Sequence, residues 1–138
     1  MFKRIAILSM VIVLSACGRI NIHNYKAHNE ENISPDKLSI LHATRYHFVH
    51  EIDGKGRYSP THVSDAFPYT GAKIELLPGK HTLSIKYKSS RILSNGTTDI
   101  DFDFSAGKQY LLHSKKHYTT DDFNQVTTFV KYRISECG

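Results

Sequence analysis

Residues 98–104 alternate strictly between apolar and acidic side chains. The apolar side chains are Ile100, Phe102 and Phe104, and the acidic ones between them are Asp99, Asp101 and Asp103. A period of two places successive side chains on opposite faces of a strand, whereas a helix repeats every 3.6 residues. This segment is therefore predicted to be a β-strand with one buried and one solvated face.

The same period recurs along the chain, and helical periodicity does not. Further strands are predicted at 38–52, 72–77, 81–87, 109–113 and 126–134, with a weak one within 57–66. Segment 109–113 is apolar on both faces, as a central strand is. Short strands separated by frequent turns are typical of a sandwich or barrel. We therefore expect an all-β fold, a small antiparallel β-sandwich of about seven strands.

Turn-forming residues separate the predicted strands. Gly54, Gly79 and Gly107 can take the positive φ that tight turns need, and Pro78 fixes φ at the entry of its turn. The corresponding sequences are Asp53-Gly54-Lys55-Gly56, Pro78-Gly79, Asn95-Gly96 and Ala106-Gly107. Each is expected to join neighbouring strands.

The first residues have the layout of a secretory signal. Lys3 and Arg4 precede a run at 5–14 that is apolar except for one serine. The run is too short to span a bilayer, which needs about 20 apolar residues. The sequence Leu14-Ser15-Ala16-Cys17 that ends it resembles the lipobox of bacterial lipoproteins. The alternative is an ordinary signal peptide whose removal leaves a free secreted protein.

The lipobox resemblance implies cleavage between Ala16 and Cys17 and a covalent diacylglycerol lipid on the Cys17 sulfur, with an acylated new amino terminus. Gly18 stands where an aspartate often signals retention at the inner membrane, so the resemblance implies the cell outer membrane. Three acyl chains make detachment negligible, because two already hold stably. The membrane is then the first partner of the protein. The face of the membrane on which the domain sits is left open.

Processing leaves three parts with different roles. Residues 1–16 are the signal peptide, 17–37 a lipidated, polar and flexible tether, and 38–138 the β-sandwich domain, a normal length for one core. Loss of Lys3 and Arg4 leaves 16 Lys and Arg against 13 Asp and Glu, a formal charge of +3. That excess is too small to indicate a nucleic-acid partner.

A second resemblance covers about residues 48–112. The segments Ile52-Asp53-Gly54-Lys55, 74–83 around Leu77-Pro78-Gly79-Lys80, and 104–110 around Ala106-Gly107 resemble PEGA-type and related small cell-envelope lipoprotein domains. That resemblance implies an immunoglobulin-like or transthyretin-like sandwich in which these segments are hairpins. It implies no chemistry.

Cys137 is the only cysteine besides Cys17. If Cys17 is acylated, an internal disulfide is excluded, and Cys137 is left for an intermolecular disulfide or is a frayed terminal residue with no role.

Nine histidines invite a metal or pH-sensing hypothesis: His23, His28, His42, His47, His50, His62, His81, His113 and His117. His113 and His117 are the best candidates for zinc, since residues four apart share a face. Zinc needs three or four converging ligands, however, and neither a Cys-x-x-Cys nor a His-Glu-x-x-His motif is present. Dispersed surface histidines are the simpler interpretation, and no metal or other cofactor is expected.

No catalytic motif is present. The chain lacks a nucleophile elbow, a phosphate-binding loop and a dinucleotide fingerprint. The Asp99, Asp101 and Asp103 stripe lacks the glycine and glutamate of a calcium loop, so we expect a solvated face opposed by Lys86 and Lys88. The sequence thus predicts no enzyme. It predicts a lipid-anchored structural or partner-binding module of the envelope, with an envelope protein as a second partner, and a histidine-based metal or proton sensor as the alternative.

Overall fold

A computed structural model describes residues 23–58, 71–89 and 96–137, and nearly all of its ordered elements are strands. The elements are β1 (His23–Lys26), the short 3-10 helix η1 (Pro35–Lys37), β2 (Ser39–Thr44), β3 (His47–Ile52), β4 (Gly71–Leu76), β5 (Gly79–Tyr87), β6 (Thr98–Phe104), β7 (Gln109–Thr120) and β8 (Val126–Glu136). The all-β prediction is confirmed. The described residues contain no helix that is both long enough and apolar enough to cross a bilayer.

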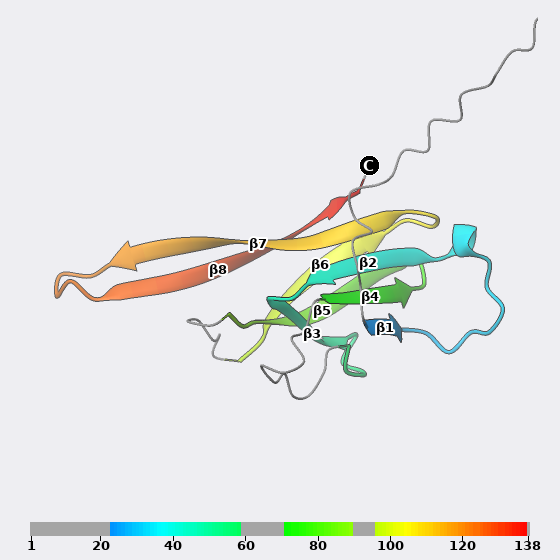
Figure 1. The fold of residues 1–138 in the computed structure, drawn as a ribbon, viewed down its shortest axis with the longest axis horizontal. Helices are drawn as coiled ribbons and strands as arrows, with labels where there is room; N and C mark the ends of the chain where they lie inside the picture. The colour runs from blue at the N-terminus through cyan, green and yellow to red at the C-terminus, as the bar shows by residue number, and fades with distance from the viewer. Residues whose placement is uncertain (1–22, 59–70, 90–95, 138) are drawn as a thin grey trace, which may run out of the picture.

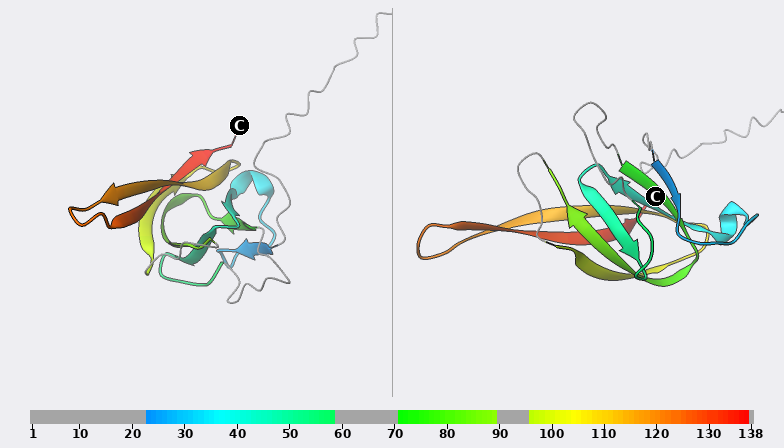
Figure 2. Two further views of the ribbon diagram at one scale, coloured as in Figure 1. Left: turned by 60° about the vertical axis from the view of Figure 1, so that its left-hand side comes forward. Right: turned by 90° about the horizontal axis from the view of Figure 1, so that it is seen from below.

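The strands form two sheets that face each other (Figures 1 and 2). The larger sheet has the order β1-β4-β2-β7-β8, and the smaller sheet has the order β3-β5-β6. The sandwich is therefore confirmed, with eight strands in the described residues. It is not purely antiparallel, because β1 pairs with β4 and β2 pairs with β7 in parallel. As predicted, β7 begins as an interior strand, between β2 and β8.

The core lies between the inward faces of the two sheets. Its largest fully buried apolar side chains are Leu41, Val49, Ile74, Leu76, Leu83, Ile85, Phe104 and Leu112. Leu83 and Ile85 of β5 and Phe104 of β6 point inward, as the alternation in both segments predicted. Each such side chain contributes about 1.5–3 kcal/mol when it leaves water. The alternating segments thus supply most of one wall of the core.

The expected single strand at 38–52 is in fact two strands in different sheets. β2 pairs with β4 and β7, whereas β3 pairs with β5 after a turn at Arg45 and Tyr46. The chain crosses from one sheet to the other at this turn. The sequence has no glycine or proline at the crossing, which is why the break was missed.

Two of the expected hairpin turns are instead corners between the sheets. Leu77 and Pro78 join β4 of the larger sheet to β5 of the smaller one. The turn at Gly107 joins β6 of the smaller sheet to β7 of the larger one. Gly107 has φ 73°, and a Cβ atom there would lie 3.2 Å from the Asp36 carbonyl oxygen. Glycine is therefore required at that corner for backbone conformation and for packing. Residues 59–66, where most of the weak strand was expected, lie outside the described residues.

The domain begins earlier than the predicted boundary at residue 38. β1 pairs with β4 from His23↔Ala72 to Lys26↔Glu75, and Tyr25 and Ala27 pack against the core. The prediction that 17–37 is wholly a tether is therefore wrong. The segment is polar because β1 is an edge strand in which every second side chain is exposed and the others are only partly buried.

The end of the larger sheet carries a long two-stranded projection. β7 pairs with β2 only over Gln109–Leu112, whereas its pairing with β8 runs on to Thr120↔Val126. We call residues 113–133 the arm. Figure 1 shows it extending well beyond the other strands, and the view from below in Figure 2 shows the same. The predicted strand at 109–113 is therefore only the base of a much longer one.

Candidate functional site

Ala16 and Cys17, the predicted cleavage and lipidation residues, lie outside the described residues. Cys137 directly follows β8, and its backbone N–H donates to the Gln109 carbonyl at 2.8 Å, so the end of the chain is held to β7. The Cys137 sulfur is disulfide-bonded.

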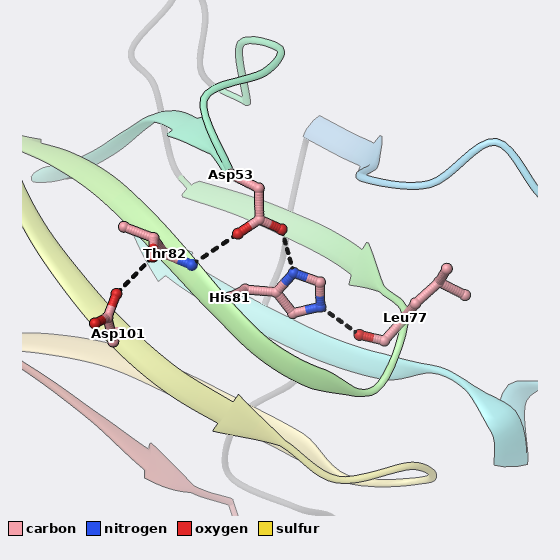
Figure 3. A network of polar contacts seen from close by, with 5 residues as sticks. All are labelled: Asp53, Leu77, His81, Thr82 and Asp101. Carbon is pink, nitrogen blue, oxygen red and sulfur yellow. Dashed lines mark hydrogen bonds and ion pairs between the residues drawn. The ribbon is translucent and has the colours of Figure 1, made fainter.

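A network of polar contacts joins the turn after β3 to β5 and β6 (Figure 3). Asp53 Oδ2 accepts the Nδ1–H of His81 at 2.5 Å, and Asp53 Oδ1 accepts the backbone N–H of Thr82 at 2.9 Å. The Nε2–H of His81 donates to the Leu77 carbonyl at 2.7 Å, and the Thr82 hydroxyl donates to Asp101 at 2.5 Å. Four segments of the fold are thereby tied together.

The turn itself explains why Asp53 is placed there. Asp53 and Gly54 have φ of 53° and 73°, and Ile52 and Lys55 exchange backbone hydrogen bonds at 3.1 Å. Two successive residues with positive φ make the Asp-Gly turn that suits a right-twisted pair of strands. The predicted turn at Gly54 is thus confirmed, and it aims the Asp53 carboxylate at β5.

The network is suited to holding a turn. Both nitrogens of His81 face acceptors, the Asp53 carboxylate and the Leu77 carbonyl. Its Nε2 atom is occupied by the Leu77 carbonyl and cannot serve as a general base. Burial opposes ionisation of Asp53, but the hydrogen bonds from His81 and Thr82 outweigh it and lower the pKa of the Asp53 carboxyl.

We expect Asp53→Asn to destabilise the fold by about 1 kcal/mol. This is less than the usual value for a hydrogen bond to a charged group, because the Asp53 carboxylate is half exposed and solvent screens it. Asparagine tolerates the positive φ but its amide nitrogen cannot accept the His81 proton. Because the folded-state pKa is lowered, the Asp53 contribution is present above about pH 4 and lost as pH falls through that lowered value. Urea unfolding at pH 7 measures the loss. Asp103→Asn, exposed on β6, is the matched control, and equal losses in both would contradict the assignment.

The acidic stripe on β6 faces solvent, as predicted, but its partners are different. The register sets Asp99 opposite Ser84, Asp101 opposite Thr82 and Asp103 opposite Lys80. The predicted pairing with Lys86 and Lys88 is therefore wrong. The hydroxyls of Ser84 and Thr82 donate to Asp99 and Asp101 at 2.6 and 2.5 Å. The stripe is a ladder of hydrogen bonds along an edge strand.

The zinc candidates His113 and His117 do share a face of β7, but a strand separates residues four apart by about 13 Å. They cannot ligate one ion together. His113 instead lies 3.1 Å from the Ser135 hydroxyl on β8. Among the described residues, no three His, Cys, Asp or Glu side chains come close enough to hold a metal.

His47 is the histidine with the most unusual environment. Its ring is buried between Tyr87 and Tyr132, and its two nitrogens lie 2.7 Å from the hydroxyls of Thr44 and Ser114. A neutral ring satisfies both hydroxyls, donating to one and accepting from the other. Burial, and then the charge of His113, lower the pKa of His47 to about 4. This histidine is a neutral core residue at the base of the arm.

A groove of about 630 Å³ lies between the outer face of the larger sheet and the connection from β1 to β2. Lysines 26, 73 and 108 line it together with Glu30, Asp36 and Glu75. The His28 ring beside it is almost fully buried, 3.5 Å from Glu75. Three lysines and three carboxylates line the groove, so its charge does not select one class of ligand.

The arm is the most unusual surface of the described residues. Their exposed large hydrophobic side chains all lie on it: Tyr118 (63% exposed), Phe123 (86%), Val126 (63%) and Phe129 (52%). Water-exposed apolar residues gathered in one place mark a contact site. A usable signal for this site is present in the sequence, since Phe123 lies in the turn 121–125 and Tyr118 and Phe129 lie on either side of it. The arm was missed because a strand was expected to end at 113.

No family model matches this chain, and neither a curated protein nor a solved structure matches it.

Proposed function

We propose that this protein is a lipid-anchored, non-enzymatic module of the bacterial outer membrane that acts by contact through its arm. The anchor rests on Leu14-Ser15-Ala16-Cys17 behind an apolar run with a cationic start. The resemblance to PEGA-type domains agrees with an envelope location.

One observation carries the contact role. The exposed large hydrophobics of the described residues cluster around the tip of the arm, which is far from the core that they could otherwise join. The hydrogen-bond network at Asp53 and His81 supports the same proposal, since its imidazole is occupied on both sides and holds a turn. The chemistry on the described surface is thus suited to binding.

The anchor has a direct test. We expect Cys17→Ser to abolish metabolic labelling by a palmitate analogue and to leave a precursor that retains residues 1–16. Cys137→Ser is the matched control and should label and mature normally. A Cys17→Ser protein that still labels and matures would overturn the anchor.

The same experiment decides the chemistry of Cys137. One sulfur cannot carry both a diacylglycerol and a disulfide, so acylated Cys17 cannot pair with Cys137. The intact mass of the detergent-extracted protein, with and without reductant, distinguishes the two states. A mature protein with an unmodified amino terminus and an internal disulfide would contradict the anchored function.

A further inference from the structure

The turn at the tip of the arm is held in one conformation. Asp121 Oδ1 accepts the backbone N–H groups of Phe123 at 2.9 Å and Gln125 at 2.8 Å. Asn124 has φ 59°, and its N–H donates to the Asp121 carbonyl at 3.1 Å. These bonds leave the Phe123 ring 86% exposed. The tip presents an aromatic side chain to its surroundings without any rearrangement.

Apolar side chains surround the tip on both faces of the ribbon. The register with β8 puts Tyr118 and Val126 on the face that continues the core side, and Phe129 on the opposite face. A flat protein partner would contact one face of a ribbon. Apolar groups on both faces and at the turn suit a tip that enters the interface of a lipid bilayer end-on.

Cationic side chains form a collar behind the tip. Lys116 lies on one face, and Lys115, Lys131 and Arg133 lie on the other. They stand two to four residues behind Phe129 and Tyr118, a distance of about 7–13 Å along the strands. The polar layer of a bilayer is about 5–8 Å thick on each side. With Phe129 and Tyr118 at the acyl boundary, this collar would therefore lie at the outer edge of the headgroup layer.

The arm has unfavourable features that an anionic surface would relieve. Lys115 lies directly opposite Lys131, and like charges so placed are destabilising. A two-stranded ribbon is marginal in water without further packing. Asp121 and Asp122 at the turn lower the formal charge of the arm to +2 and keep the insertion shallow.

We infer that the tip of the arm inserts into the headgroup region of an anionic lipid bilayer. This inference rests on the contact role proposed for the arm and names what it contacts. Aromatic side chains favour the membrane interface, and each Lys or Arg near an anionic surface strengthens binding about fivefold.

The path of the chain brings the arm close to the anchored bilayer. β1 begins at the pair His23↔Ala72, and Thr44 pairs with Gly71 at that end of β2 and β4. At the same end, Ala43 of β2 pairs with Leu112 of β7, the last residue of β7 before the arm begins. The chain thus enters the larger sheet at the end from which the arm leaves. Five residues lie between Cys17 and His23, so the two Cα atoms can be at most about 20–22 Å apart.

The protein contains no tryptophan, so Phe123→Trp introduces a single fluorescent reporter at the tip. The full acylated chain is reconstituted in vesicles of phosphatidylethanolamine and phosphatidylglycerol, or of phosphatidylcholine alone, each with a headgroup-proximal spin-labelled lipid. We expect blue-shifted and quenched emission in the anionic vesicles only. Adding Lys115→Gln and Lys131→Gln to the Phe123→Trp protein should lower the ratio of membrane-inserted to detached arms in anionic vesicles by about 20- to 30-fold.

The experiment needs one reporter away from the arm and a second reporter on it. Lys80→Trp, exposed on β5 at the end away from the arm, should not be quenched in either vesicle. Phe129→Trp is a second arm reporter in case substitution at the turn disturbs the tip, and it should behave as Phe123→Trp does.

Three results would overturn the inference. The first is an unquenched arm reporter in anionic vesicles, and the second is equal quenching in both vesicle types. The third is a blue shift that grows with protein concentration without lipid quenching, which would indicate a second copy of the chain. Flotation with phosphatidylcholine vesicles tests the lipid anchor separately, because uncharged vesicles report acylation without the arm.

Discussion

Lowering the pH from 7 to 4 is expected to destabilise the folded protein by about 3 kcal/mol through His47 alone. Burial and the neighbouring charge of His113 lower the pKa of His47 from its ordinary value of 6.5 to about 4. The unfolded chain therefore binds a proton at His47 near pH 6.5, and the folded protein binds one only near pH 4. The stabilisation is complete above pH 6.5 and is lost progressively as pH falls toward 4.

Urea unfolding at pH 7, 6, 5 and 4 measures this dependence, and His47→Gln isolates it. The variant should be less stable at pH 7, because glutamine cannot reproduce both the contacts to Thr44 and Ser114 and the packing between two tyrosine rings. Its stability should then change less between pH 6.5 and 4. His50→Gln, on the same strand but partly exposed, is the control. An unchanged pH slope in His47→Gln would show that this histidine is not the acid-sensitive group.

Phe104→Ala should cost about 3–5 kcal/mol, a large part of the 5–15 kcal/mol that stabilises a typical domain. Phe104 is 1% exposed and ends β6 in the centre of the core. Its ring contacts those of Phe102 and Tyr110 edge to face, with centroids 4.9 and 5.1 Å away. The substitution removes these contacts and leaves a cavity that strands from both sheets border.

The matched control for that experiment is Phe129→Ala on the arm. Phe129 is 52% exposed, so its truncation should change the free energy of unfolding by no more than about 0.5 kcal/mol. Circular dichroism should show a sheet spectrum for both variants at low temperature. Equal losses of stability at the two positions would contradict the division between a packed sandwich and an arm outside it.

The strands and their inward faces could be predicted because alternation is a local property. The apolar residues of β5 and β6 point into the core as their period of two required, and the Asp53-Gly54 turn follows from two adjacent residues that tolerate positive φ. Sheet membership is not local. Nothing in 38–52 marks the point at which the chain changes sheets, and the corners at Pro78 and Gly107 look like hairpin turns in sequence.

The candidate sites were harder to predict, for the same reason. Asp53 and His81 are 28 residues apart and meet only because β3 pairs with β5. The second strand of the arm lies within the predicted segment 126–134, but the first was missed beyond 113 because residues 114–120 are polar except for Tyr118, so pairing between strands holds it rather than burial. β1 was missed because four residues with one inward ring give little periodic signal.

The parallel pairing of β2 with β7 also affects how the chain can fold. β2 ends at Thr44 and β7 begins at Gln109, so more than sixty residues must be present before β2 gains its second neighbour. Contacts between such distant segments cost loop entropy before they return any stability, and folds rich in them form slowly. A nascent or truncated chain that stops before residue 109 would carry β2 with one backbone edge open to any passing strand. Such an edge is a template for aggregation, which the last thirty residues close off.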